Sequence, residues 1–218
     1  MLAFQLISNE VFPLKKTDTC AAALIFMNDW QIKHLPVVDN GKVIGFVSEK
    51  TLPDDEKKKI NDQINTSECF VNEHMHLFDV LKKLHDFQLT SIAVVDDENV
   101  FRGIILTREL ATIIYNNSSL KQDGGIVVLE IKSHNYSLAE IARISEANNA
   151  KIIYVHVEQV ENNNQLVHVS LKYNVSDLKS IIATFERFNY TIVYATQTED
   201  ESHNFKSRYN WLLKYLNT

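Results

Sequence analysis

The fold is decided by a stretch that occurs twice: Leu35-Pro-Val-Val-Asp-Asn-Gly-Lys-Val-Ile-Gly-Phe-Val-Ser48 and, about 58 residues later, Ile92-Ala-Val-Val-Asp-Asp-Glu-Asn-Val-Phe-Arg-Gly-Ile-Ile-Leu106. Each copy has the pattern of an apolar strand, a polar turn and a second strand led by glycine. A repeat of this length predicts two similar supersecondary units that bury their apolar faces against each other.

A helix is predicted in front of each copy. Thr17 and Asp18 offer an N-cap for the first helix, and a strand at 69–71 precedes the second. Apolar residues recur at helical spacing in both segments. These residues are Cys20, Ala23, Leu24 and Met27 in the first copy and Leu77, Val80, Leu81 and Leu84 in the second. Both units are therefore predicted to run β-α-β-β-α.

The second half of the chain has a different pattern. The polar stretch 116–125 ends in Gly-Gly and is typical of a domain boundary. Strands are predicted at 126–131, 150–160, 166–173 and 190–196, with a helix after the first and another after the third. This order, β-α-β-β-α-β, is the ferredoxin-like arrangement.

The predicted fold class is α+β, with domains at 1–117 and 125–197. The first domain holds two units, at about 8–55 and 65–115. A C-terminal amphipathic helix is expected at 199–218, because four large apolar residues lie on one stripe. They are Phe205, Tyr209, Leu212 and Leu216. Such a stripe needs a surface to cover it, so we expect a homodimer.

Composition narrows the possible partners and compartments. The net charge is -6, with 22 Lys and Arg, so the chain has no basic field that would attract nucleic acid. No run approaches the ~18 apolar residues of a membrane span. The two cysteines, Cys20 and Cys69, do not form the even framework of a secreted domain. We therefore expect a cytoplasmic protein with no nucleic-acid or membrane partner.

The doubled motif resembles the CBS motif, two of which pair as a Bateman module, over roughly residues 8 to 115. Residues 125–197 are similar in element order to an ACT domain. The order CBS, CBS, ACT resembles the AcuB-type proteins of acetoin utilisation. These resemblances imply a regulatory or ligand-sensing protein without a catalytic domain of its own.

The CBS resemblance implies a ligand motif, Gly-h-h-[Ser/Thr]-x-x-Asp, in which the hydroxyl meets a phosphate and the carboxylate meets the ribose. The first copy keeps the hydroxyl of Ser48 but has Thr51 at the acidic position. The second copy keeps a carboxylate, Glu109, but has Leu106 at the hydroxyl position, with Thr107 one residue away. Each copy therefore holds half of the motif.

The resemblance implies AMP, ADP or ATP as the effector, with Glu109 on the ribose and Ser48 or Thr107 near the phosphate. Arg108 or Lys50 could also reach a phosphate. The alternative is structural. On that interpretation Ser48 and Thr107 cap helices, and the charged residues beside them are solvated.

The ACT resemblance implies an effector loop after the first strand of the second domain, where a Gly often lets the backbone meet an amino acid. Here the loop is Lys132-Ser-His-Asn-Tyr-Ser-Leu138, without Gly, which disfavours the usual site. Asn135, Tyr136 and Ser137 could line a different pocket. The alternative is that Asn135 or Ser137 caps the helix while Tyr136 packs at its start.

No other chemistry is predicted. Cys69, His74 and His76 are spaced irregularly and lack a fourth ligand, so we expect no metal site. The chain has no nucleophile elbow and no phosphate-binding Gly-rich loop, so we expect no enzyme. The leading hypothesis is a regulatory homodimer that acts on a partner protein. The alternative is an assembly protein that has lost its ligands.

Overall fold

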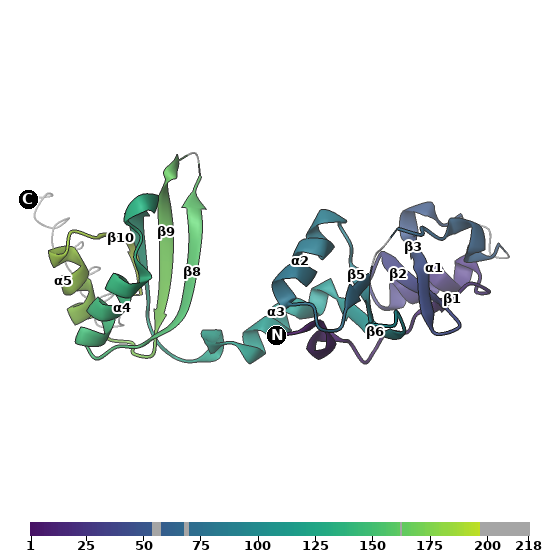
Figure 1. Ribbon diagram of the computed structural model, residues 1–218, viewed down its shortest axis with the longest axis horizontal. Coiled ribbons are helices and arrows are strands. Elements are labelled where there is room, and N and C mark those ends of the chain that lie inside the picture. Colours follow the sequence, from purple (N-terminus) through teal and green to yellow (C-terminus); the bar gives the residue numbers. More distant parts are fainter. Residues whose placement is uncertain (54–57, 68–69, 162, 197–218) are drawn as a thin grey trace, which may run out of the picture. The chain divides into compact units, whose positions relative to one another are not determined.

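The computed structural model describes residues 1–53, 58–67, 70–161 and 163–196 (Figure 1). The chain divides into two compact units, unit 1 (Met1–Ile114) and unit 2 (Tyr115–Thr218). The predicted C-terminal helix at 199–218 lies outside the described residues. None of the helices in the described part of the chain combines the length and apolar character that crossing a bilayer requires.

Unit 1 contains two three-stranded sheets of the same topology, ordered β1-β2-β3 and β4-β5-β6. In each sheet the first strand is parallel to the second, and the second and third form an antiparallel hairpin. The elements are η1 (Ala3–Leu6), β1 (Leu14–Lys15), α1 (Cys20–Asp29), β2 (His34–Asp39), β3 (Lys42–Ser48), η2 (Glu49–Thr51), η3 (Ile60–Gln63), β4 (Phe70–Asn72), α2 (Leu77–Asp86), β5 (Ser91–Val95), β6 (Phe101–Leu106) and α3 (Thr107–Asn117). The predicted repeat is confirmed.

The two copies differ after their last strand. The second continues into the eleven-residue helix α3, whereas the described residues that follow β3 in the first form only the 3₁₀ turn η2. The prediction of a closing helix in both copies is therefore wrong for the first. Pro53 explains the difference, because a residue before proline is driven out of the helical region, and Leu52 is extended, with ψ 126°.

Each copy of unit 1 is completed by the segment that precedes the other. Ala3 and Leu6 belong to the apolar core of the second copy, whereas Ile60 belongs to the core of the first. Ser8 forms a β-bridge with Ile104, and Asn65 forms the matching bridge with Phe46. The two copies are therefore interlocked, and neither has a complete core by itself.

This exchange accounts for the glycine in each motif. A Cβ on Gly45 would lie 2.3 Å from the backbone oxygen of Asn65, and one on Gly103 would lie 2.4 Å from Cγ2 of Ile7. Gly45 also has φ +149°, which side chains disfavour. Both glycines are thus required by the close approach of the exchanged segments, whether or not a ligand binds.

Unit 2 is a four-stranded antiparallel sheet, ordered β10-β7-β9-β8, with helices α4 and α5 on one face (Figure 1). Val127, Leu129, Val169 and Leu171 alternate along the central strands and are fully buried on the helix side. The elements are η4 (Ser119–Lys121), β7 (Ile126–Lys132), η5 (Ser133–Asn135), α4 (Leu138–Ala147), β8 (Ile152–Val160), β9 (Asn163–Tyr173), α5 (Lys179–Arg187) and β10 (Thr191–Ala195). The predicted ferredoxin-like order is observed.

Candidate functional site

Glu109 lies in the first turn of α3, and its carboxylate has a hydrogen-bond partner there. Its Oε1 accepts a hydrogen bond of 3.1 Å from the hydroxyl of Ser8, which the exchanged N-terminal segment brings to this place. Ser8 is 8% exposed and the Glu109 side chain 29% exposed. Because a carboxylate has four lone-pair positions, this bond leaves Glu109 able to accept from a ligand as well.

Arg108 lies beside this carboxylate. Its Nη1 donates to the carbonyl of Trp30 at 2.5 Å, and its Nη2 lies 3.4 Å from Oε2 of Glu10 and 3.9 Å from Oε1 of Glu109. The guanidinium therefore links the end of α1 to the start of α3. We call the group Ser8, Glu10, Trp30, Arg108 and Glu109 the Glu109 site.

Thr107 is not part of this arrangement. Its hydroxyl donates to the carbonyl of Leu89 at 3.0 Å, so its proton is not available to a phosphate oxygen. Thr107 is the first residue of α3 rather than the cap that precedes a helix, which differs from the predicted N-cap. Leu106, which stands at the motif's hydroxyl position, is fully buried. Of the residues predicted for the second copy, the structure brings together Arg108 and Glu109.

The matching group of the first copy lacks a carboxylate at the motif position. Ser48 precedes the turn η2 but makes no side-chain cap bond there. The hydroxyl of Thr51 donates back to the carbonyl of Ser48 at 3.0 Å. Lys50 is close enough to His34 to contribute to lowering its pKa. This group has hydroxyls, a cation and the carboxylate of Glu49, but no acidic residue at the motif position that would meet a ribose.

His34 and Thr90 join the two copies of unit 1. Nδ1 of His34 accepts from the Thr90 backbone N–H at 3.3 Å, and the Thr90 hydroxyl accepts from the Lys33 N–H at 2.8 Å. Ser91 adds a bond of 2.6 Å to the His34 carbonyl. Burial lowers the pKa of His34, and the nearby Lys50 and Lys33 lower it further. The lowered pKa favours the neutral imidazole of His34 at this contact between the two copies.

Sequence reasoning did not predict the contribution of Ser8, Glu10 or Trp30. These residues lie far along the chain from Glu109. The exchanged segment brings Ser8 and Glu10 near it, and the pairing of the two copies brings the end of α1, with Trp30, near it. One signal was present: the pair Ile7-Ser8 recurs in the second copy as Ile64-Asn65 at the corresponding place before the first strand.

The three residues predicted to line an effector pocket in unit 2 have different roles in the structure. The Ser137 hydroxyl accepts from the Glu140 N–H at 3.3 Å and so caps α4. Tyr136 packs against the apolar core. Asn135 lines a cavity of about 540 Å³ between this loop and the turn before β10. Of the three, Asn135 is the one that lines this cavity.

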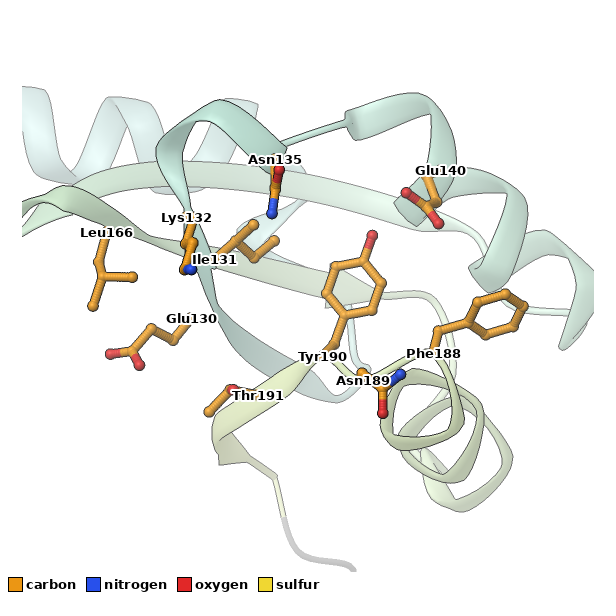
Figure 2. A pocket seen from close by; sticks show the side chains of 10 residues that line it. All are labelled: Glu130, Ile131, Lys132, Asn135, Glu140, Leu166, Phe188, Asn189, Tyr190 and Thr191. Atoms are coloured by element: carbon orange, nitrogen blue, oxygen red, sulfur yellow. The ribbon is translucent and has the colours of Figure 1, made fainter.

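Figure 2 shows Asn135, Glu140 and Tyr190 directed toward the same hollow. Burial raises the pKa of Tyr190, and its hydrogen bond to Glu140 raises it further. Lys132 supplies a cation on the same lining, opposite in charge to Glu130 and Glu140. A lining with both signs of charge suits a small polar molecule better than an apolar one.

The described residues contain no group of three His, Cys, Asp or Glu side chains that could hold a metal ion. His74 is paired instead with Glu73 at 3.8 Å. Cys69, the third residue weighed for such a site, lies outside the described residues.

Two segments of unit 1 match a known family model. Residues 3–52 and 62–116 each match the model of the CBS domain. These residues form a CBS domain pair. The exchanged segments and the paired sheets of unit 1 are therefore those of a CBS pair, and the Glu109 site lies at the start of the second domain's final helix.

Proteins similar to this CBS pair include an enzyme and several solved structures. An inosine-5'-monophosphate dehydrogenase of Methanocaldococcus jannaschii is 27% identical over 111 residues, 50% of this chain but only 22% of that enzyme. A CBS domain pair/ACT domain protein of Thermotoga maritima matches with a TM-score of 0.49 and 21% identity, covering 54% of this chain and 100% of that one. A putative acetoin utilisation protein of Vibrio cholerae matches with a TM-score of 0.47 and 22% identity, and the match covers 53% of this chain and 91% of that one.

Proposed function

We propose that this protein is a non-catalytic, cytoplasmic regulatory protein whose CBS pair binds an adenine nucleotide, AMP, ADP or ATP, at the Glu109 site. The ligand class comes from the CBS family, whose solved structures include complexes with AMP, with ATP and with S-adenosylmethionine. We also propose that the chain works as a homodimer and passes the binding signal to a partner protein.

One observation carries the nucleotide proposal. A carboxylate and a guanidinium, those of Glu109 and Arg108, lie 3.9 Å apart on the first turn of α3. Glu109 can accept hydrogen bonds from ribose hydroxyls. The side chain of Glu10 is 71% exposed, so its ion pair with Arg108 is weak. Arg108 can therefore give up this pair and bind a phosphate instead. Glu109 and Arg108 both contact the exchanged N-terminal segment, through Ser8 and Glu10. A ligand bound to them would therefore also alter the contacts of the segment that leads into the first copy.

The alternative function is a ligand-free assembly or interaction protein. Two observations favour it. Thr51 replaces the carboxylate in the first copy, and in the second Arg108 and Glu109 already have partners in Trp30 and Ser8. A site whose polar groups are satisfied internally gains less from a ligand, because each new bond replaces an existing one.

Titration calorimetry of the full chain with AMP, ADP and ATP tests the proposal. We expect binding of at least one nucleotide, weakened roughly 10- to 100-fold by Glu109→Ala, because a hydrogen bond to a charged group is worth about 1.5 to 3 kcal/mol. Glu98→Ala, an exposed carboxylate on the β5–β6 turn, is the matched control and should bind like the parent. Binding that survives Glu109→Ala would place the site elsewhere, and no binding to the parent would support the ligand-free alternative.

A second ligand site is proposed in unit 2, where Asn135 lines the 540 Å³ cavity. The opposite charges of Lys132 and Glu140 favour a zwitterion, such as an amino acid. A thermal-shift panel of amino acids tests this, since a ligand at 100 times its dissociation constant stabilises by about 2.7 kcal/mol. A shift that persists unchanged in Lys132→Ala would exclude this cavity.

A further inference from the structure

Unit 2 has a second hollow, of about 200 Å³, between helices α4 and α5. Phe188 lines both this hollow and the 540 Å³ cavity. In Figure 2 the Phe188 side chain is directed away from Asn135, whereas Tyr190 points into the larger cavity. The two spaces therefore lie on different sides of Phe188. We call the smaller one the α4–α5 hollow, and its charged lining residues are Arg143 of α4 and Arg187 of α5.

The two arginines bring positive charge to the same place. Both are exposed, and the guanidinium carbon lies 6.0 Å from the centre of the Phe188 ring for Arg143 and 5.7 Å for Arg187. Within the described part of the chain, neither guanidinium forms an ion pair or a hydrogen bond. Glu140, one turn before Arg143 on α4, is hydrogen-bonded to Tyr190 instead. Two neighbouring cations without a carboxylate partner attract an anion.

A role at the helix end explains only one of these arginines. Helix α5 ends at Arg187, where a cation stabilises the negative end of the helix dipole. Arg143 lies inside α4, whose last turn carries no basic residue. The position of Arg143 beside Arg187 therefore needs another explanation, and an anion shared by the two guanidiniums supplies one.

The hollow also contains a fixed neutral donor. Asn148 and Thr184 line it and join the two helices, with the Thr184 hydroxyl 3.2 Å from Oδ1 of Asn148. Nδ2 of Asn148 donates to the Ile144 carbonyl at 2.8 Å. An amide nitrogen carries two N–H groups, so the second is available to an acceptor in the hollow. Because both ends of the amide are held, this donor is preorganised.

We propose that the α4–α5 hollow binds a small anion with two negative charges, a phosphate or a dicarboxylate, between Arg143 and Arg187, with Asn148 donating a further hydrogen bond. Paired, planar N–H donors of arginine match the oxygens of both kinds of group. The 200 Å³ volume is below the roughly 300 to 1,000 Å³ of pockets for drug-sized ligands, so it suits an ion or a small acid rather than a nucleotide. The inference depends neither on the Glu109 site nor on the proposed amino-acid cavity.

NMR of the full chain tests the proposal through the arginine Nε–H and asparagine side-chain amide signals. Inorganic phosphate and succinate are titrated separately at pH 8, with chloride at matched ionic strength as the reference. We expect the signals of Arg143, Arg187 and Asn148 to shift together and to saturate with at least one of the two anions. Tighter binding of phosphate would identify a phosphate-bearing ligand, and tighter binding of succinate a dicarboxylate.

Arg143→Gln and Arg187→Gln should each weaken this binding about tenfold or more, because each removes a charge-assisted donor. Lys172→Gln is the matched control. It removes the same charge from the opposite face of the sheet, since its neighbours Leu171 and Tyr173 on β9 are buried on the helix side. This variant should bind like the parent, and the same spectra show whether each variant is folded.

Three results would overturn the proposal. The first is that phosphate and succinate shift the signals of Arg143, Arg187 and Asn148 no further than chloride does. The second is equal binding by the parent and both glutamine variants. The third is a saturable shift confined to Arg108, which would assign the anion to the Glu109 site. Because each arginine is observed separately, failure at this hollow leaves the nucleotide proposal standing.

Discussion

The hydroxyl of Ser8 donates a hydrogen bond to the carboxylate of Glu109 at 3.1 Å, between residues 101 positions apart in the chain. Ser8 also bonds through its backbone N–H to the Ile104 carbonyl at 2.8 Å. The exchanged N-terminal segment is thus attached both to β6 and to the helix that follows it. The candidate nucleotide site is therefore complete only when the N-terminal segment is in its place in the CBS pair.

The bond between Ser8 and Glu109 should contribute measurably to stability. In a double-mutant cycle of Ser8→Ala and Glu109→Ala, we expect a coupling of about 1 kcal/mol in the free energy of unfolding, since Ser8 is buried but Glu109 is partly hydrated. Urea unfolding of the four proteins measures it. Strictly additive effects would show that the bond contributes nothing in solution.

Alanine at the two motif glycines should destabilise the protein to different degrees. Gly45→Ala meets the backbone of Asn65 and a strained φ, whereas Gly103→Ala meets only the side chain of Ile7, which can move. We expect a loss of about 2 to 3 kcal/mol for Gly45→Ala and about 1 kcal/mol for Gly103→Ala in denaturant unfolding. Gly41→Asn is the control, because Gly41 has no atom within 4 Å of its Cβ position and asparagine tolerates its positive φ. The opposite order would refute the role given to the Asn65 segment.

His34 should make unit 1 sensitive to acid. Its pKa is lowered in the folded state, first by burial and then by Lys50 and Lys33. The unfolded chain therefore takes up a proton near the ordinary pKa of 6.5 while the folded chain does not, and stability falls as the pH drops below 6.5. Thermal unfolding at pH 7.5 and 5.5 measures this loss. His34→Gln should show a smaller loss than the parent, and an equal loss would assign the acid sensitivity to other groups.

Tyr173 should make unit 2 sensitive to alkali. Its ring is fully buried and its hydroxyl lies 3.0 Å from that of Ser145. Burial raises its pKa to about 12, so stability present below pH 10 is lost as the pH rises toward 12. Tyr173→Phe should cost about 1 kcal/mol at pH 7 but flatten the alkaline loss. Ser145 keeps a partner in the Ile141 carbonyl, so the variant leaves no unpaired hydroxyl. An unchanged alkaline profile would contradict this assignment.

The sequence alone determined the architecture of this protein. The repeated strand pairs, with Gly45 and Gly103 at the same place in each, predict two paired units of like topology because apolar periodicity and turn residues are local properties, and the resemblance of the repeated motif implied a CBS pair. The change of pattern after residue 116 likewise predicts the second unit and its order of elements. Within the described part of the chain the predicted helix after β3 is wrong, and it lies beside Pro53, whose effect on Leu52 is also local.

The tertiary structure decided which side chains meet. Nothing near Glu109 in the chain indicates that Ser8 is its partner, or that Arg108 bonds to the carbonyl of Trp30. The hydroxyl of Thr107, a nucleotide contact or a helix cap on sequence grounds, is used by the Leu89 carbonyl instead. The contact of Ser8 arises because each CBS copy is completed by the segment preceding the other, and those of Arg108 and Thr107 arise where the start of α3 meets the residues that follow α1 and α2. Contacts between residues far apart in the chain leave no periodic trace in the residues around a motif.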